Sequence, residues 1–503
     1  MRNRMEIATL VLAMTSIIHV TAFAQNSSQG LPMNMQPNDM GNLQTNVPTS
    51  QNLDTHSTMA LQEPENPGHR TGENLPASEL LKDAATRPAK TLADFEALAD
   101  SNNPTLRQAD LLVRKSEEQA RQAGLYPNPS VGYQGEQIRG GSFGGGEQCG
   151  FVQQTIVLGG KRGLRRDIYD QEKIADQIGV QEQTYRVHGD VEQTFYAALT
   201  AQAAVQLRQR LLGVALDAAE TVHQLANVGQ ADAPDILQTE VETEQAKVDY
   251  VTAQRQYLQA FRMLATVSGK GDLEVTPLQG DLEKTPELNA EQIVDSIAQD
   301  SPVVKRAQQE AEVARARLKD AKRESVPDLQ LRAGEQYNGE HVSENPTKPA
   351  GAQSFASAGI NIPLWNRNQG NVETAKAEIE RASQDVVREQ LALHQQASAL
   401  AQSYEAAKFE VERYKTQLLP RAARAYELYL NKYQNMAQAY PQVLVSQRTL
   451  FQLQIHYLEA LRDVWQSAIA LQNYTLSGGL DTPMSRGSSS TSINLPAAGG
   501  SAD

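Results

Sequence analysis

The stretch FVQQTIVLGGKRGLRRD, residues 151–167, changes the character of the chain within a few positions. A run rich in β-branched residues ends at Leu158, and the two glycines that follow permit a backbone turn that other residues resist. After Lys161 and Arg162 the pattern becomes helical for about 65 residues. The sequence therefore predicts a strand that passes directly into a very long helix.

The composition bounds the class of protein. Of 503 residues 40% are hydrophobic but only 5% are aromatic, which favours long helices with close-packed seams over globular cores. The net charge of −14 argues against a nucleic-acid partner, because phosphate binding needs a basic face. No phosphate-binding loop, dinucleotide fingerprint or nucleophile elbow occurs, and the lone Cys149 has no companion base. We therefore expect neither an enzyme nor a cofactor.

Both ends of the chain differ from its middle. Residues 1–24 combine two early arginines, an apolar run and the ending Ala-Phe-Ala, which predicts a cleaved secretory signal. Residues 25–89 and 478–503 are rich in small and polar residues, and we expect a disordered leader and a disordered tail there. Past the signal, no stretch of ~18 apolar residues predicts a membrane-spanning helix.

The middle of the chain repeats one plan. We expect a first structural repeat over 90–268, a connector over 269–288 and a second repeat over 289–477. Each copy opens a helix with a polar cap, Asn103 or Ser301, followed by Pro. Later, ANVGQADAPDIL in the first copy aligns with YQNMAQAYPQVL in the second. A period near 200 residues indicates a duplicated domain instead of a solenoid.

Each copy contains two strand candidates in which apolar and polar residues alternate, so that each strand has one apolar face. The four candidates are 129–138, 149–158, 328–338 and 354–364. Four such strands leave two edges with unpaired backbone groups, which a membrane does not tolerate. Three chains that pool their hairpins supply twelve strands, enough to close a barrel. Strands of ~9–11 residues are also the length that crosses an outer membrane.

The helix after the second hairpin has the clearest period in the chain. Seven residues from Val372 to Tyr414 fall seven apart, and neither Gly nor Pro interrupts 371–419. A row maintained for this long predicts a left-handed supercoil against neighbouring helices. A helix of ~65 residues makes a rod of ~100 Å. Pro420 lies inside this second rod and should kink or split it.

The strands, junctions and long helices of the two repeats, in the order in which they follow one another along the chain, resemble those of the outer-membrane efflux factors, or TolC-type channels. The resemblance covers about residues 90–477. TVHQLANVGQADAPDILQTEVE looks like the helix–turn–helix tip of that family. QQTIVLGGKR, residues 153–162, is similar to its strand-to-helix junction, particularly in the CzcC-like divalent-cation branch. INIPLWNRNQGN, residues 360–371, has the form of the second junction.

The resemblance implies a mixed α and β fold, a duplicated TolC-like protomer. Its four transmembrane strands would contribute to a trimeric twelve-stranded β-barrel, and its long helices would form a periplasmic α-barrel. The implied setting is a homotrimer in the outer membrane of a Gram-negative bacterium, in contact with outer-membrane lipid and extending into the periplasm. The implied partners are a periplasmic adaptor (membrane fusion) protein and an inner-membrane RND pump.

The implied function is passive export, without catalysis, by a tripartite pump. The resemblance to the metal branch favours divalent heavy-metal cations as substrate. An outer-membrane channel for drugs or for type I protein secretion is the alternative within this class. A coiled-coil surface stalk or adhesin is the alternative of another class, although a stalk does not need two hairpins buried mid-chain.

The resemblance assigns the periplasmic mouth to the tips at 227–235 and 435–441. The candidates for adaptor contact and for the gate are Val228, Gly229, Asp232, Asp235, Met436 and Ala437. In a trimer the two aspartates would either line the mouth as a ring of six carboxylates that favours cations or simply cap a helix.

The strand-to-helix junction consists of Gly159, Gly160, Lys161 and Arg162. We expect the basic residues here, together with Arg165 and Arg166, to lie in solvent or among lipid headgroups. Four histidines further along, none of them at ligand spacing, predict no metal site. They are His188, His223, His394 and His456.

Overall fold

The computed structural model describes residues 86–137, 146–229, 231–341, 349–434 and 440–483. All of them belong to one compact unit, Gly72–Asp503. The signal, nearly all of the leader, and Met436 and Ala437 of the second tip lie outside the described residues. Within the described residues, no helix combines the length and the apolar character needed to cross a membrane.

The two halves of the chain have the same order of elements. The first half contains α2 (Leu92–Asn102), α3 (Pro104–Ala123), β1 (Ser130–Glu136), β2 (Glu147–Ile156), α4 (Lys161–Asn227) and α5 (Ala233–Val267). The second contains α6 (Ala290–Asp300), α7 (Pro302–Arg323), β3 (Leu329–His341), β4 (Pro349–Ile360), α8 (Gln369–Arg413), a π-helical turn (Tyr414–Leu418), α9 (Leu419–Gln434) and α10 (Tyr440–Gln472).

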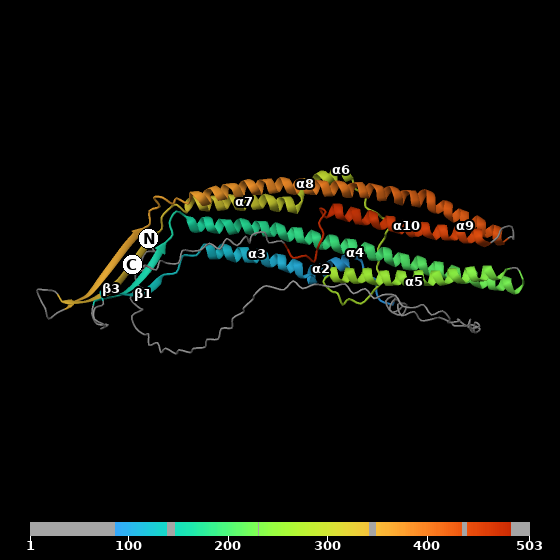
Figure 1. Ribbon diagram of the computed structural model, residues 1–503, viewed down its shortest axis with the longest axis horizontal. Helices are drawn as coiled ribbons and strands as arrows, with labels where there is room; N and C mark the ends of the chain where they lie inside the picture. Colours follow the sequence, from blue (N-terminus) through green and yellow to red (C-terminus); the bar gives the residue numbers. More distant parts are fainter. Residues whose placement is uncertain (1–85, 138–145, 230, 342–348, 435–439, 484–503) are drawn as a thin grey trace, which may run out of the picture. The chain divides into compact units, whose positions relative to one another are not determined.

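The helices lie alongside one another, and the sheet adjoins the end at which α4 and α8 begin (Figure 1). Helix α4 packs along α3, α5, α7 and α10, while α8 packs along α7 and α10. The expected caps are confirmed, because the side chain of Asn103 accepts from Thr105 N and that of Ser301 accepts from Val303 N. Proline follows each cap at the first helical position.

The long helix expected after Gly160 is confirmed as α4, which has 67 residues. Its seven-residue row faces other helices, since Val191 and Ala198 are fully buried. Around them a first core gathers residues of α2, α4 and α5, and its aromatic centre includes Phe95 in edge contact with Phe261. A second core gathers residues of α6, α8 and α10 around the fully buried Tyr404.

Two short helices were absent from the expected order. Helices α2 and α6 each occupy the place before the capped helix of their half. Phe95 and Ala99 of α2 are fully buried, and Ile297 of α6 is 1% exposed. Each of these helices has only 11 residues, which is short for a helix to be stable alone, so it depends on the core that it covers.

The interruption expected near Pro420 is confirmed. It takes the form of the π-helical turn Tyr414–Leu418, which ends two residues before the proline. Proline has no backbone N–H and its ring crowds the preceding turn, so a wider turn accommodates it without breaking the rod.

Four antiparallel strands form one sheet in the order β1-β2-β3-β4. Val131 pairs with Val152, Val152 with Ala333, and Ala333 with Ala356. Directly paired residues share a face, so this row runs across the apolar face of the sheet. On the opposite face the row that starts at Ser130 continues with Gln153, Arg332 and Ser357, and the row that starts at Gln134 is also largely polar; between them Gly132 and Gly334 alternate with Phe151 and Phe355. The expected alternation is therefore confirmed, and Val131 is 80% exposed in the single chain.

The fourth strand differs from its expected bounds of 354–364. The observed β4 is Pro349–Ile360, so Ile362 and Leu364 lie beyond it. Pro363 has no N–H to donate to a ladder, which explains why pairing stops before it. The other three strands differ from the expected bounds by no more than three residues.

The C-terminal strap, residues 478–483, is packed, although the sequence placed it in the disordered tail. Gly479 N donates to Asp190 Oδ2 over 2.7 Å, and Gly479 O accepts from Thr105 Oγ1 over 2.7 Å. A Cβ atom at Gly479 would lie 2.8 Å from Val187 Cα, so only glycine fits. The expectation was wrong here because these bonds join distant parts of the chain and leave no local pattern.

The connector between the halves has no helix or strand but is fastened at several points. Arg87 Nη1 donates to Val275 O over 2.8 Å, and Lys90 bridges Leu278. Further on, Trp465 Nε1 donates to Leu282 O over 2.9 Å. Residues from Arg87 onward, which the sequence placed at the end of the disordered leader, are therefore held against the connector.

Candidate functional site

The junction between strand and helix turns on two glycines. Gly159 and Gly160 both have φ of 72°, in the left-handed region that favours glycine. A Cβ atom on Gly159 would also lie 3.0 Å from Val326, so the turn packs closely against the segment that leads into β3. This turn sets the direction in which α4 leaves the sheet.

Lys161, the first residue of α4, is buried, with only 2% of its side chain exposed. Its Nζ atom lies 2.8 Å from Asp328 Oδ1 and 4.0 Å from Glu324 Oε1. Asp328 Oδ1 also accepts from Leu158 N over 3.1 Å. The expectation that Lys161 lies in solvent or among headgroups was therefore wrong. The β2–β3 ladder ends at Ile156↔Leu329, which brings the residue before β3 next to the start of α4.

The other basic residues of the junction hold neighbouring helix ends. The Arg162 guanidinium lies over the Tyr126 ring, 3.2 Å from its centroid, and donates to Gly124 O over 3.1 Å. Arg165 is more exposed and reaches Glu324, with Nη2 3.1 Å from Oε2. Together these contacts tie the ends of α3 and α7 to the start of α4.

The polar face of the sheet carries a basic residue that sequence reasoning missed. Arg332, in the central strand β3, stacks over Phe151 with 3.8 Å from Cζ to the ring centroid, and it donates to Gln134 Oε1. Gly132 leaves space for the Phe151 ring, since a Cβ atom there would lie 2.5 Å from it. A signal was available in the alternation, which places Arg332 on the polar side of its strand.

The first tip has the geometry of a capped turn. Val228 is the C-cap of α4 and is 68% exposed, and Gly229 has φ of 74°. Asp232 caps α5, with its Oδ1 atom accepting from Asp235 N over 3.2 Å. Asp235 lies in the first turn, where a carboxylate favours the helix dipole. The capping interpretation of Asp232 thus holds in the single chain.

Near the tips, an ion pair joins two helix pairs, α4 with α5 from the first half and α9 with α10 from the second. Arg448 Nη2 of α10 lies 2.6 Å from Glu242 Oε1 of α5. Glu242 is well covered, with 15% of its side chain exposed, whereas Arg448 is 60% exposed. The sequence gives no hint of this pair, because the two residues are 206 positions apart.

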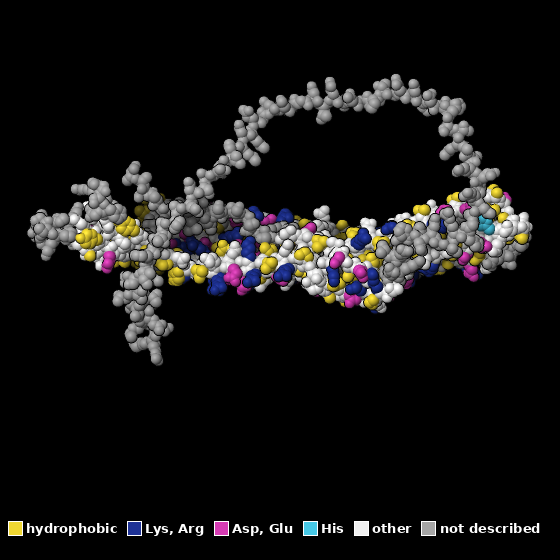
Figure 2. All heavy atoms as spheres, turned by 90° about the horizontal axis from the view of Figure 1, so that it is seen from below, with side chains coloured by type: hydrophobic (Ala, Val, Ile, Leu, Met, Phe, Trp, Pro, Cys, Tyr) yellow, Lys and Arg dark blue, Asp and Glu magenta, His cyan; other side chains and the backbone are white. Residues whose placement is uncertain are grey.

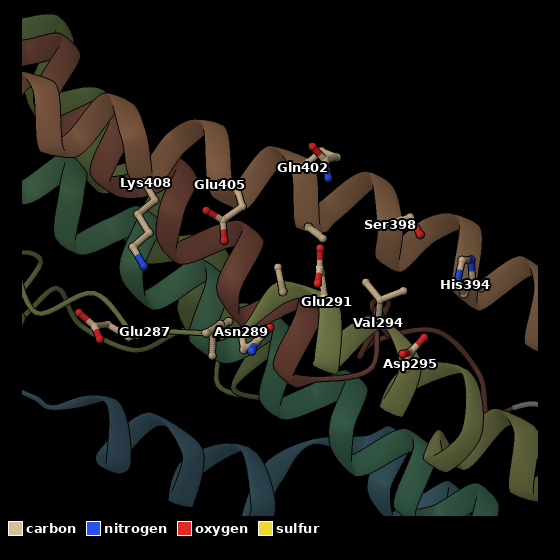
Figure 3. Close-up of a pocket in the computed structure, with 13 residues that line it drawn as sticks. Glu287, Asn289, Glu291, Val294, Asp295, His394, Ser398, Gln402, Glu405 and Lys408 are labelled. Atoms are coloured by element: carbon tan, nitrogen blue, oxygen red, sulfur yellow. The ribbon is translucent and has the colours of Figure 1, made fainter.

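An open groove of about 890 Å³ lies between α6 and α8. Figure 3 shows that its carboxylates are spread along the groove and do not converge on one point. Glu287, Glu291, Asp295 and Glu405 line it, together with His394 and Lys408. Among the residues that the structure describes, no group of three or more His, Cys, Asp or Glu side chains is arranged to hold a metal ion.

The remaining histidines expected to be solvated or packed are paired with single carboxylates. His188 Nε2 lies 2.7 Å from Asp100 Oδ1, and His456 Nδ1 lies 3.0 Å from Glu459 Oε2. His223 Nε2 is 3.5 Å from Glu240 Oε1. Cys149 is buried on the polar face of β2.

A duplicated hairpin that feeds two long helical rods is the plan of an efflux channel protomer. The family model described as "Outer membrane efflux protein" matches residues 97–270 and again residues 293–476. The chain therefore belongs to the outer membrane efflux protein family.

Known proteins of this kind are similar to most of the chain. The cobalt-zinc-cadmium resistance protein CzcC of Cupriavidus metallidurans is 23% identical over 381 residues, which are 76% of this chain and 88% of CzcC. The solved structure of CusC has a TM-score of 0.63 at 17% identity, covering 77% of this chain and 92% of CusC. The open state of the MtrE outer membrane channel of Neisseria gonorrhoeae has a TM-score of 0.61 at 19% identity, covering 78% and 90%. The expected TolC-like fold is thereby confirmed.

Proposed function

We propose that this chain is the outer-membrane channel of a tripartite efflux pump and that it exports divalent heavy-metal cations. The observation that carries the proposal is the four-stranded sheet with one apolar face, joined at one end to helical rods as long as α4. The likeness to CzcC, whose name refers to resistance against cobalt, zinc and cadmium, supports the choice of substrate. The site of action is the outer membrane of a Gram-negative bacterium.

The edges of the sheet support assembly as a homotrimer. Strands β1 and β4 each have a neighbour on one side only. Unpaired N–H and C=O groups are too costly in a membrane, so β4 of one copy pairs with β1 of the next. Three copies close twelve strands into a barrel with the apolar face toward lipid and the polar face, with Arg332, toward the lumen.

The helical rods continue the duct into the periplasm, where the tips form its mouth. In the closed state the ion pair between Arg448 and Glu242 holds α10 against α5. An adaptor that contacts the tips, around Val228 and Gly229, separates the two helix pairs and opens the mouth. Cations then diffuse outward through a wetted duct, and the inner-membrane RND pump supplies the energy.

A deletion strain tests the substrate. We expect loss of resistance to zinc, cobalt, cadmium or copper and unchanged resistance to hydrophobic antibiotics, with restoration by the intact gene. Sensitivity to antibiotics alone would favour a drug channel. Single-channel recording in planar bilayers tests the duct itself, and a purified trimer that never conducts, even after the tips are loosened by substitution, would favour a surface stalk.

A further inference from the structure

Trp365 is the most exposed large apolar side chain among the described residues, at 87%. It lies between β4 and α8, beside Ile362 and Leu364, which are also exposed. A side chain of this size is costly to leave in water, where burial contributes roughly 1.5–3 kcal/mol for even smaller apolar residues. We therefore expect another molecule to cover the apolar side chains of this segment.

The backbone around Trp365 is well held. Gln369 Nε2 donates to Trp365 O over 3.2 Å, and Gln369 Oε1 accepts from Arg367 N over 2.8 Å. Asn368, with φ of 64°, donates through Nδ2 to Ala321 O of α7 over 2.8 Å. A side chain presented by such a fastened loop has a fixed place relative to the sheet.

That place adjoins the end of the sheet at the pair Leu329↔Ile360. The apolar face extends from the pair Leu329↔Ile360 to the pair Tyr337↔Ala352, with Glu335↔Ser354 as the polar pair within it. The eight steps from Leu329 to Tyr337, at ~3.3 Å each and tilted by ~40°, give a height of ~20 Å, against ~25 Å for the apolar band of an outer-membrane barrel. Ile362, Leu364 and Trp365 follow Ile360 at the end of the sheet where the helices begin, and all three are exposed.

Charged side chains become frequent where the sheet ends and the helices begin. In the view of Figure 2 the sheet shows mostly hydrophobic and uncharged side chains, whereas Lys and Arg alternate with Asp and Glu along the helices. Arg367, two residues after Trp365, is exposed. An exposed aromatic ring followed by an exposed basic side chain suits the boundary between acyl chains and phosphate headgroups.

We propose that Trp365, flanked by Ile362 and Leu364, anchors each protomer at the headgroup level of the phospholipid leaflet that faces the periplasm. The inference rests on the proposed function, because it needs the sheet to cross the outer membrane. The occupant of this surface is lipid, and a protein partner that covers Trp365 instead is an outcome that the experiment detects.

The sequence offers a direct test, because it has two tryptophans, Trp365 and Trp465. Trp465 is buried, stacked on Tyr196 with ring centroids 3.6 Å apart. The full chain is reconstituted into vesicles of phosphatidylethanolamine and phosphatidylglycerol that carry bromine either high or low on the acyl chains. Trp465→Phe leaves Trp365 as the reporter, and Trp365→Phe is the matched control that reports Trp465.

We expect bromine near the headgroups to quench Trp365 more strongly than deep bromine, and neither to quench Trp465. Should Trp465→Phe fail to fold, the difference between the wild type and Trp365→Phe gives the same signal. Unquenched Trp365, with emission at the wavelength of indole in water or of an indole covered by protein, overturns the anchor. Stronger quenching by deep bromine overturns its placement at the headgroups. Conductance of the same vesicles then separates the two proposals, since a conducting channel with unquenched Trp365 leaves the duct intact.

Discussion

The buried ion pair of the junction leads to an asymmetric prediction. Removing Asp328 leaves the Lys161 ammonium buried, with Glu324 as a remaining partner at 4.0 Å. Removing Lys161 leaves a carboxylate that is 31% exposed and still accepts from Leu158 N. Asp328→Asn should therefore cost much more stability than Lys161→Met, although both break the same pair.

The magnitude follows from burial. Breaking a buried pair by removing one partner costs ~3–5 kcal/mol, and we expect Asp328→Asn to approach the lower end of this range because Glu324 remains. Lys161→Met should cost ~1 kcal/mol or less, since the carboxylate left behind is solvated and methionine fills the same channel. The double variant should be more stable than Asp328→Asn alone, because it leaves no buried charge.

Urea unfolding in detergent, followed by far-ultraviolet circular dichroism, measures these differences. Arg166→Gln is the matched control, because the Arg166–Asp170 pair is exposed, with 64% and 45% of the two side chains accessible. We expect it to change the free energy of unfolding by ~0.5 kcal/mol or less. Equal costs for Asp328→Asn and Lys161→Met, or a double variant no better than Asp328→Asn, would refute the reasoning.

Three further outcomes are expected. Arg448→Gln removes the ion pair with Glu242 near the tips, which is worth ~1 kcal/mol or less. It should raise the fraction of open channels up to about fivefold in planar-bilayer recordings. An unchanged open fraction would contradict the role of this ion pair in closing the mouth. Gly269→Ala should cost ~1–3 kcal/mol in urea, because φ is 77° and the new Cβ lies 2.6 Å from Asn102 C, whereas Gly213→Ala, with open space, should be neutral or stabilising. Burial raises the pKa of the Asp190 carboxyl above 3.8, so wild-type stability falls as pH rises from 3.8 through the native value. Asp190→Asn should lack this fall in the free energy of unfolding with rising pH. Parallel pH profiles of the free energy of unfolding for the two proteins would contradict a contribution from Asp190.

The sequence predicted the parts of the fold that local patterns encode. The seven-residue row predicted α4 and α8 because a helix that packs along its whole length repeats the same contact every two turns. Alternation predicted the two faces of the sheet, and the Asn103 and Ser301 caps marked where helices begin. Each of these signals lies within a few residues of the feature that it specifies.

The missed features depend on residues far apart in the chain. Lys161 looked solvated because its partner Asp328 is 167 positions away and meets it only through the β2–β3 ladder. The pair between Arg448 and Glu242 has the same origin. In both cases the side chains are ordinary charged residues, and only tertiary pairing distinguishes them from the many that face water.

The C-terminal strap also constrains the order in which the protomer folds. Gly479 bonds to Thr105, 374 residues earlier, and to Asp190 in the middle of α4. A chain still being synthesised lacks these bonds, so its first half completes this packing only after Gly479 has been made. Truncation just before the strap therefore removes contacts of α3 and α4 in the first half as well as the strap itself.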